Sequence, residues 1–441
     1  MPAFAAQTFL LLQGPVSPFF RRLAVRLEAS GHRVLRVNFS LGDWLFWRRP
    51  GAINYRGSLE AWPAFVADLL VREGVTDLVL LGEQRPYHRI AVEEAEARGV
   101  RVTVTDFGYL RPDWLALERD GMGGRSRFPR RPAAIRALAA TFPPPELGQR
   151  YGDDFAAQSR WDLVYQLANT LVRLPFPHYR SHHLANPVMV HITTGWRLLN
   201  GAQARRAAAR AVRAARAAGQ PYWVFPMQME LDYSIRAYSR FDGMEAPLRE
   251  VISSFARQTR EDRLFIKLHP LDSGMRDWRG LIREAATAAG AADRVNFIDG
   301  GDLPDLLVGA RGLVTVNSTV GLMALQAGLP TLALGQAIYD VEGLTFQGML
   351  DRFWTEARAP EPALLADFVR AAAGALHIRG VYYKEPGLGA AVEAAAERLG
   401  ACAAIEMAAR IAQAEAVADL GAGFGADAGE RPEPALSRRA G

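Results

Sequence analysis

The chain has 441 residues, of which 49% are hydrophobic and 22% charged, with a formal net charge of +5. This length exceeds that of most single domains, so we expect two globular domains with separate cores. The single cysteine, Cys402, excludes an intrachain disulfide framework. The chain has neither a basic signal-peptide region at its start nor an apolar run of about 18 residues, so we expect a cytoplasmic protein that is not integral to a membrane.

Arginine supplies nearly all of the positive charge, since the lysines of the chain are Lys267 and Lys384. The guanidinium group forms paired hydrogen bonds with phosphate and carboxylate, so we expect anionic partners. No zinc-finger spacing, helix-turn-helix pattern or aromatic RNA-binding signature accompanies the arginines, and we therefore expect no nucleic acid among those partners.

Apolar segments in the first half alternate with helical periodicity. Strands are predicted at about 8–13, 33–38, 76–81 and 100–105. Helices are predicted near 17–30, 59–72 and 86–98. This alternation is typical of a doubly wound parallel sheet.

The second half repeats the pattern. Strands are predicted near 222–226, 263–268, 294–298, 313–316 and 330–334, and helices near 245–258, 276–289, 303–309 and 319–327. We therefore divide the chain into a first α/β domain at 1–190, a second at 191–380 and a helical segment at 381–418. The tail at 419–441 has too few apolar residues to join a core and is expected to be disordered.

The first strand-to-helix turn, "LLLQGPVSPFF", bears on the kind of ligand. Pro15 and Pro18 stand where a dinucleotide-binding loop needs glycines, and proline removes N–H donors. No phosphate-binding loop of the G-x-x-x-x-G-K-[ST] type is present either. Ligands of another kind are expected outside the carboxyl ends of both sheets, in a cleft between the domains.

The segment "LVTVNSTVGLMALQAGLPTLALG" predicts a buried strand, the turn Asn317-Ser318-Thr319 and a helix. A helix that begins at the carboxyl end of a strand presents free N–H groups, which suit a phosphate. The strand "RLFIKLHPLD" ends in His269-Pro270 at the same expected edge, so the imidazole and the helix start could share one phosphate. The alternatives are an ordinary helix cap and a loop histidine.

The His-Pro and Ser-Thr pair resembles the nucleotide-binding motifs of bacterial CMP-sugar glycosyltransferases with the GT-B fold. Longer strings resemble the β-Kdo transferases of capsular polysaccharide assembly, among them "GEQRPYHRIA", "GYLRPDWLALE", "QMELDYSIRAYS" and "YDVEGLTFQGMLDRFW". The resemblance implies an α/β, GT-B-like fold with two Rossmann-like, doubly wound domains that face a central cleft. It covers the chain from about residue 10 to about residue 354.

The resemblance also implies an activity and its partners. The donor would be CMP-β-Kdo and the acceptor a phosphatidylglycerol-type lipid at the inner face of the cytoplasmic membrane, and the reaction would retain configuration. Other capsule assembly and export proteins are implied as partners, whereas no cofactor or metal is expected. Alternatives are a transferase for another CMP-sugar, such as sialic acid, and a non-catalytic capsule export component.

Retention through two displacements requires a carboxylate beneath the anomeric carbon and a second group for the acceptor proton. Asp106 ends the strand "VRVTVT", and Glu83 follows the strand "DLVLLG". The resemblance matches Asp106 to the acid that precedes a Gly-aromatic-Leu-Arg string. The relatives often have two adjacent acids there, whereas this chain has Asp106-Phe107, so Glu83 stays open as nucleophile or as acid and base. A strand-end turn role for Asp106 also stays open.

Further candidates for substrate binding lie beside these carboxylates. The cations expected to hold the Kdo carboxylate are Arg85, Arg89 and Arg111, with surface ion pairs as the alternative. The other candidates are His88, Gln13 and Gly14.

Candidate nucleotide contacts also come from the second domain. In "QMELDYSIRAYS", Gln228, Glu230 and Asp232 alternate as in an extended segment and could receive ribose or cytosine groups. They could equally bind Arg236. The set of expected nucleotide contacts is completed by Lys267, His269, Pro270, Asn317, Ser318 and Thr319. The adjacent pair His182 and His183 lacks a third ligand in register, so no metal site is expected.

Two aromatic and basic segments are candidates for membrane contact. The segment "GDWLFWRRPGAINYRG" contains Trp44, Phe46, Trp47, Arg48 and Arg49. The segment "GGRSRFPRRP" contains Arg125, Arg127, Phe128, Arg130 and Arg131. Aromatic rings at head-group depth and arginines on phosphates suit an interfacial contact, whereas core packing and a solvated charged face are the alternative.

Overall fold

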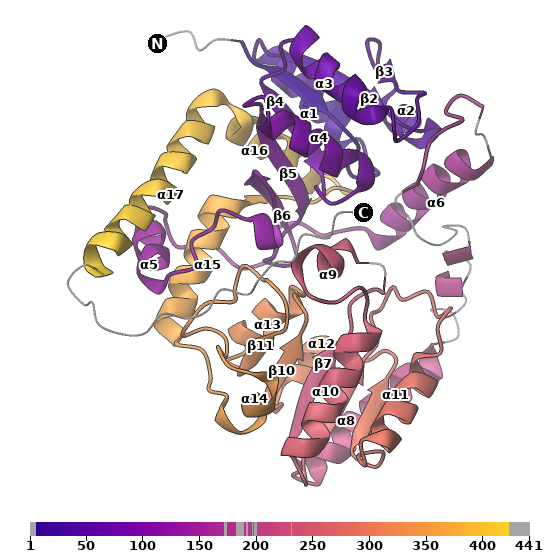
Figure 1. The fold of residues 1–441 in the computed structure, drawn as a ribbon, viewed down its shortest axis with the longest axis vertical. Coiled ribbons are helices and arrows are strands. Elements are labelled where there is room, and N and C mark those ends of the chain that lie inside the picture. The colour runs from indigo at the N-terminus through magenta and orange to yellow at the C-terminus, as the bar shows by residue number, and fades with distance from the viewer. Residues whose placement is uncertain are drawn as a thin grey trace.

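The structure is a computed structural model that describes residues 6–171, 174–181, 189–190, 193–195, 197, 201–230 and 232–422. Within these ranges it contains a seven-stranded sheet and a five-stranded sheet. The two sheets lie in the upper and lower parts of the molecule in Figure 1. The expected fold class, two doubly wound α/β domains in a GT-B-like arrangement, is confirmed.

The seven-stranded sheet forms the first domain and has the order β12-β6-β5-β4-β1-β2-β3. Its strands are β1 (Thr8–Leu11), β2 (Arg33–Asn38), β3 (Ile53–Asn54), β4 (Asp77–Leu81), β5 (Arg101–Phe107), β6 (Trp114–Arg119) and β12 (His377–Arg379). Strands β1 to β5 pair in parallel, whereas β6 pairs antiparallel with both β5 and β12. The sequence prediction missed β3, β6 and β12, because two of them are very short and β6 is not separated from β5 by a helix.

Helices cover both faces of this sheet. Leu10, Leu78 and Leu80 pack with α3 (Trp62–Arg72) and α4 (Pro86–Glu96). Phe9, Leu11 and Val79 on the opposite face pack with α1 (Phe19–Ala29) and α16 (Gly387–Leu399). Burial on both faces explains why the central strands are apolar throughout and show no polar alternation.

The five-stranded sheet is entirely parallel and has the order β11-β10-β7-β8-β9. Its strands are β7 (Tyr222–Pro226), β8 (Arg263–Lys267), β9 (Val295–Ile298), β10 (Gly312–Thr315) and β11 (Thr331–Ala333). Helices α10 (Glu245–Gln258), α11 (Trp278–Ala288) and α14 (Leu350–Glu356) cover one face, and α8 (Ala202–Ala217), α12 (Leu303–Leu307) and α13 (Val320–Gln326) the other. All five strands were predicted, with ends that differ by one residue at most.

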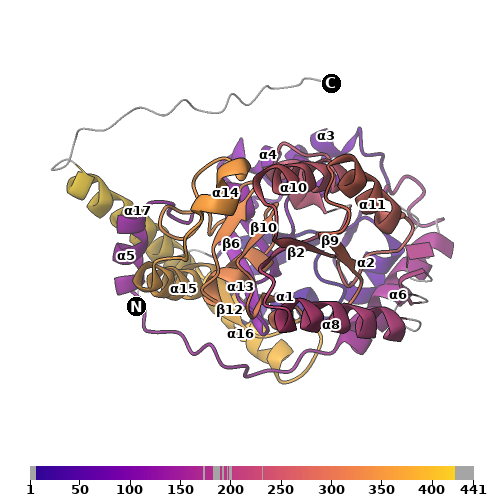
Figure 2. The same ribbon diagram turned by 90° about the horizontal axis from the view of Figure 1, so that it is seen from below.

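After α14 the chain returns to the first domain. Strand β12 extends the first sheet through the pairing of His377 with Ala116. Helices α15 (Pro362–Leu376) and α17 (Ala401–Ala422) pack on α5 (Pro132–Ala140), and both views show α17 beside α5 (Figures 1 and 2). The range 191–380 expected for the second domain thus spans two spatial units, because periodicity identifies a helix but not the sheet that it covers.

One hydrophobic cluster connects the two domains. It contains Ile135 of α5, Leu322 and Leu325 of α13, and Phe368 of α15. Since these side chains are buried together, the cluster holds the two sheets in a defined relation. No helix within the described residues has both the length and the apolar character that a bilayer crossing requires.

Each sheet has a point where the winding direction reverses. In the first sheet β1 pairs with both β2 and β4, and in the second β7 pairs with both β8 and β10. The carboxyl edge beside such a point is the usual ligand position in doubly wound proteins. Gln13 and Glu83 follow β1 and β4, and Gln228 and Asn317 follow β7 and β10. The predicted site residues therefore stand at both reversal points.

Candidate functional site

Asp106 lies near the carboxyl end of β5 and is half-buried. Its Oδ1 accepts a hydrogen bond from the backbone N–H of Phe107 at 2.7 Å. Burial raises the pKa of Asp106, whereas that backbone hydrogen bond and the charges of Arg85 and Arg111 lower it. No side chain within the described ranges donates a hydrogen bond to this carboxylate, so a desolvated acid stands open beside two cations.

Arg85 and Arg111 provide those cations. Arg85 is the N-cap residue of α4 and precedes Pro86, whose ring suits the first helical position. Arg111 stacks over the ring of Phe107, with its guanidinium carbon 5.2 Å from the ring centroid. Neither guanidinium forms an ion pair with any described residue, so both charges are available to an anionic ligand.

Glu83 has a different environment, since only 4% of the residue is exposed. Its Oε1 accepts hydrogen bonds from the hydroxyl of Tyr238 and from the backbone N–H of Met122, the latter at 3.4 Å. Tyr238 ends α9 (Tyr233–Tyr238) of the second domain, and its hydroxyl also accepts a hydrogen bond from Gln84 at 2.8 Å. Burial and the charge of Glu83 raise the pKa of Tyr238. Glu83 therefore connects the domains.

His88 and Arg89 lie on α4 but do not share the situation of Arg85. The His88 ring is fully buried, and its Nδ1 donates to the carbonyl oxygens of Leu81 and Gly82 at 3.0 and 2.9 Å. Burial lowers the pKa of His88 to about 3, so the ring is neutral and holds the turn after β4. Arg89 is exposed and pairs with Glu93 at 3.0 Å. Both residues thus have internal partners in place of the expected substrate contact.

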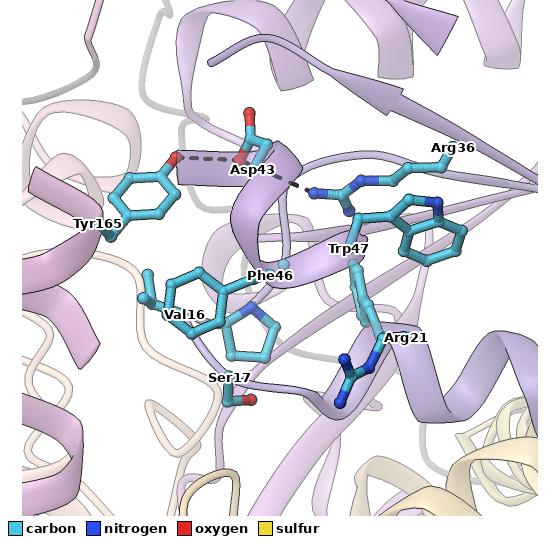
Figure 3. A pocket seen from close by; sticks show the side chains of 11 residues that line it. Val16, Ser17, Arg21, Arg36, Asp43, Phe46, Trp47 and Tyr165 are labelled. Atoms are coloured by element: carbon cyan, nitrogen blue, oxygen red, sulfur yellow. Dashed lines mark hydrogen bonds and ion pairs between the residues drawn. The ribbon is translucent and has the colours of Figure 1, made fainter. Parts of the chain in front are cut away.

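Gln13 belongs to a buried polar network. Its Nε2 donates to Asp43 Oδ2 at 3.1 Å and to the Tyr165 hydroxyl at 2.9 Å. Figure 3 shows Tyr165 and Arg36 directed at Asp43 from opposite sides. Burial lowers the pKa of Arg36. The adjoining cavity is only about 20 Å³, the size of one water, and a Cβ on Gly14 would lie 2.4 Å from the Phe20 ring. This network supports the loop, and the adjoining cavity is too small for a sugar.

The second domain has an amide pair at its reversal point. Gln228 Nε2 donates to Asn317 Oδ1 at 2.9 Å, and the Asn317 backbone N–H donates to Gln228 Oε1 at 3.1 Å. Asn317 Nδ2 donates in turn to the carbonyl oxygen of Ser234 at 2.8 Å. Asp232 accepts from the Ser234 backbone N–H at 2.9 Å and thereby caps α9. The predicted residues Gln228, Asp232 and Asn317 form one connected platform.

The turn before α13 divides its two hydroxyls between different roles. Ser318 Oγ accepts a hydrogen bond from the backbone N–H of Val320 at 3.2 Å, so the Ser318 hydroxyl is used within the turn. Thr319 occupies the N-cap position but makes no capping hydrogen bond with its side chain. The Thr319 hydroxyl is therefore available to a ligand at this edge.

His269 is the imidazole of this edge. Its Nδ1 accepts a hydrogen bond from the Leu271 backbone N–H at 3.1 Å. Burial lowers the pKa of His269, although nearby Asp232 raises it. A neutral ring that accepts at Nδ1 carries its proton on Nε2. His269 therefore offers an Nε2–H donor that no described residue uses.

Three other predicted nucleotide contacts have distinct surroundings. Lys267 is buried without an ion pair among the described residues, and its burial lowers the pKa of the ammonium group. Pro270 is exposed. Glu230 pairs with Arg276 and accepts from the Met244 backbone N–H at 2.9 Å, so it organises its own loop. His182 and His183 lie outside the described residues. Among the described ones, no group of three or more potential metal ligands is assembled.

Sequence reasoning missed two residues of the buried polar contacts in this region, Tyr238 and Glu118. Tyr238 was part of a quoted string, yet nothing local indicates its bond to Glu83. Glu118 of β6 accepts from the Tyr109 hydroxyl at 2.7 Å and from Ser126, and burial raises its pKa to about 7. Such pairs depend on the antiparallel position of β6 and on the domain interface.

The predicted membrane segments have unequal exposure. Phe128 is 2% exposed, so the expectation of an interfacial ring there is wrong. Each arginine of that segment has an internal partner: Arg125 with Glu96, Arg127 with Asp120, Arg130 with the carbonyl of Ala337, and Arg131 with Glu415 and Asp419. In the other segment Trp47 is buried, whereas Trp44 is 44% exposed and Arg48 is exposed. Of the two segments, the one that contains Trp44 presents an exposed aromatic ring beside Arg48, which has no ion pair with any described residue.

Comparisons with known proteins identify relatives of this chain. The Escherichia coli capsule polysaccharide export protein KpsS is 31% identical over 391 residues, which are 86% of this chain and 97% of the relative. The capsule polysaccharide modification protein LipB of Neisseria meningitidis serogroup B is 31% identical over 399 residues, which are 86% of this chain and 93% of the relative.

Among solved structures, Thermosulfurimonas dismutans KpsC, beta Kdo 2,7 transferase, aligns with a TM-score of 0.43 and 14% identity, over 89% of this chain and 99% of that one. The family model described as capsule polysaccharide biosynthesis protein matches residues 76–383. That range runs from the start of β4 through the five-stranded sheet to β12, which pairs with β6. The chain therefore belongs to the family of capsule polysaccharide biosynthesis proteins.

Proposed function

We propose that this protein is a retaining glycosyltransferase that moves Kdo from CMP-β-Kdo to a phosphatidylglycerol-type lipid and so starts the Kdo linker of a capsular polysaccharide. The observation that carries the proposal is the open, desolvated carboxylate of Asp106 between Arg85 and Arg111, neither of which has a described carboxylate partner in an ion pair. Kdo itself carries a carboxylate, and two unpaired guanidinium groups suit it. Family membership supports the capsular context.

The reaction proceeds through two displacements. Asp106 attacks the anomeric carbon of Kdo, the bond from that carbon to the phosphate oxygen breaks, and CMP leaves with the electron pair. The acceptor hydroxyl then attacks the glycosyl–Asp106 ester and loses its proton to a base, which regenerates the carboxylate with net retention. The charges of Arg85 and Arg111 oppose the rise that burial causes in the pKa of Asp106, and they hold the sugar carboxylate in line.

The environment of Glu83 favours Asp106 as the nucleophile. Glu83 already accepts hydrogen bonds from Tyr238 and Met122, so its Oε1 lone pairs are directed at protein donors. A nucleophile needs a lone pair directed at the sugar. We therefore assign Oε1 of Glu83 to the domain interface, whereas Oε2, to which no described group donates a hydrogen bond, can receive the acceptor proton.

The second domain supplies the CMP site in this proposal. The Nε2–H of His269 and the hydroxyl of Thr319 donate to the phosphate. The Gln228–Asn317 pair holds the loop that carries Thr319. Since His269 is neutral, its contribution is a directed hydrogen bond.

A donor screen with the full-length protein tests the function. CMP-β-Kdo and CMP-sialic acid are each supplied with a phosphatidylglycerol-type lipid, and CMP release and product mass are measured. We expect release and a lipid heavier by one Kdo with CMP-β-Kdo alone. Transfer from CMP-sialic acid alone would reassign the donor, and no release from either would favour a non-catalytic export role. Two variants accompany the screen. Asp106→Asn loses the proposed nucleophile, and Asp68→Asn, on the exposed side of α3, is its matched control.

We propose further that the protein works in the cytoplasm, at the inner face of the cytoplasmic membrane, and meets that membrane through Trp44 and Arg48. An exposed indole beside an unpaired arginine suits the head-group region. The double variant Trp44→Ala, Arg48→Gln should sediment less with phosphatidylglycerol vesicles at low salt, whereas Arg125→Gln should sediment as the wild type does. Equal sedimentation of the double variant and the wild type would remove this segment from the contact.

A further inference from the structure

A separate cavity of about 290 Å³ lies at the opposite edge of the first sheet, beneath α17. Asp77 and Arg101, the first residues of β4 and β5, line it together with Arg119, the last residue of β6. Met407, Ile411 and Ala412 of α17 form another wall. Asp106 lies five residues further along β5 than Arg101, which is about 16 Å in an extended strand. The cavity is therefore distinct from the proposed active site.

Most of the wall is aliphatic or aromatic. Apolar side chains come from β6, from the loop before α5 and from the three C-terminal helices: Leu117, Phe128, Leu376, Leu399, Met407 and Ile411. These residues lie on elements that pack on the first domain, as Figure 1 shows for α15 and α17 beside α5. A concave apolar surface of this size matches a flexible aliphatic chain.

The charges on the wall are not balanced. Arg101 pairs with Asp77 at 2.7 Å, and Arg127 with Asp120 at 2.7 Å. Arg398 bonds only to backbone carbonyls, of Gly374, Ala375 and His377. The guanidinium group of Arg119 has no hydrogen bond or ion pair with any described residue, and its Nε is fully buried.

Glu118 is the remaining acid of the wall, since Asp77 and Asp120 are paired with arginines. Glu118 lines the cavity, but its two carboxylate oxygens accept hydrogen bonds from the hydroxyls of Tyr109 and Ser126. Two guanidinium groups thus stand without a carboxylate partner at a mainly apolar wall. A guanidinium group without an anionic partner at an apolar wall favours an anionic ligand, so a head group that accepts hydrogen bonds from Arg119 gains affinity.

We propose that this cavity binds an anionic single-chain amphiphile, with its aliphatic chain between α17 and β6 and its anionic head group on Arg119 and Arg398. A neutral alkyl compound would leave the guanidinium group of Arg119 without an anionic partner. A small inorganic anion would leave the apolar volume unfilled. The inference goes beyond the proposed function, because the site lies at the other edge of the sheet and takes no part in sugar transfer.

Isothermal titration calorimetry of the full-length protein tests the ligand class. The probes are dodecyl phosphate, dodecanol and inorganic phosphate, each kept below micelle-forming concentration. We expect one dodecyl phosphate per chain and at least tenfold weaker binding of dodecanol and of phosphate. Equal affinity for dodecanol and dodecyl phosphate would reject head-group recognition, and no binding of either would reject the site.

Variants then locate the binding. Ala412 is an exposed residue of α17 at the cavity wall, so Ala412→Trp should fill the cavity and leave the fold intact, as thermal unfolding would verify. Arg119→Gln should weaken dodecyl phosphate at least tenfold, and Arg119→Lys should restore part of the loss. Arg206→Gln, on the exposed side of α8, is the matched control.

Unchanged dodecyl phosphate binding in both Ala412→Trp and Arg119→Gln would overturn the assignment, because the ligand would then bind elsewhere. The same variants should release CMP from CMP-β-Kdo as the wild type does. If the variants lost both CMP release and amphiphile binding, the cavity would belong to the active site, and the two sites would not be separate.

Discussion

The carboxyl edges of the two sheets both lie at a reversal of the winding direction, but they differ in electrostatics. The first edge holds two acids, Asp106 and Glu83, with Arg85 and Arg111 unpaired beside them. The second edge is centred on a pair of neutral amides, Gln228 and Asn317, which satisfy one another. A satisfied amide network is rigid, whereas desolvated charge is reactive. The comparison suggests that one domain carries the chemistry and the other holds the leaving group.

The two edges meet at the hydroxyl of Tyr238. Tyr238 leaves the second domain and donates to Glu83 of the first, and Gln84 donates to the same hydroxyl. Glu83, which binds across the interface, therefore has a different role from Asp106, which stays open. The predictions below test this division, from the largest expected effect to the smallest.

The sharpest test replaces the open acid. Asp106→Asn should lower transfer by about 10⁴-fold or more and leave CMP affinity unchanged, because the nucleophile is lost while the CMP site is intact. Activity is measured as CMP release, and CMP affinity by calorimetry. Wild-type protein given donor with a poor acceptor should carry one Kdo on the peptide that contains Asp106. A Kdo adduct on the Glu83 peptide would reverse the roles of the two acids.

The charged edge should also make stability depend on pH. The folded-state pKa of His88, about 3, lies below the ordinary value of 6.5, because burial disfavours the imidazolium. The neutral ring is the native form, so its stabilising effect is complete above pH 6.5. It is lost as the pH falls from 6.5 toward 3, at up to about 1.4 kcal/mol per pH unit.

Urea unfolding at pH 7.0 and at pH 5.0 measures this dependence. His88→Gln should lose less stability between the two pH values than the wild type does, since glutamine does not titrate. His178→Gln, at an exposed position, should lose as much as the wild type. An unchanged pH dependence in His88→Gln would contradict the buried neutral ring.

Removing the hydroxyl at the interface tests whether the edges are coupled. Tyr238→Phe should lower the free energy of unfolding by about 1.5–3 kcal/mol, because Glu83 loses a hydrogen bond in a buried position. The measurement is equilibrium urea unfolding. Tyr233→Phe at the other end of α9 serves for comparison. A wild-type unfolding energy in Tyr238→Phe would show that the interface does not depend on this bond.

The last test concerns the edge of the second sheet, where the expected effects are of similar size or smaller. His269→Ala should weaken CMP binding by about 1.5–3 kcal/mol, as expected for one hydrogen bond to a charged phosphate, and leave the fold intact. Ser318→Ala should weaken it less, since the Ser318 hydroxyl already accepts from Val320. Both affinities are measured by calorimetry. Unchanged CMP affinity in both variants would remove the nucleotide from this edge.

The sequence by itself determined the alternation of strands and helices and the positions of the site residues. Short apolar runs predict buried strands, and a polar residue directly after such a run lies at the carboxyl edge of the sheet. Asp106, Glu83, His269 and Asn317 were found in this way. The family motifs added the expectation of two facing domains, which the structure confirms.

Only the tertiary structure decided which of these groups stay open. The bond of Tyr238 to Glu83 joins residues 155 positions apart, and the ion pair of Arg131 with Glu415 joins residues 284 apart. The return of β12 to the first sheet is likewise a pairing across most of the chain. Hydrophobic periodicity is a local property, whereas partners so distant in sequence are chosen by how complete surfaces pack. The open state of Asp106 and the internal pairing of the basic segment follow from that packing.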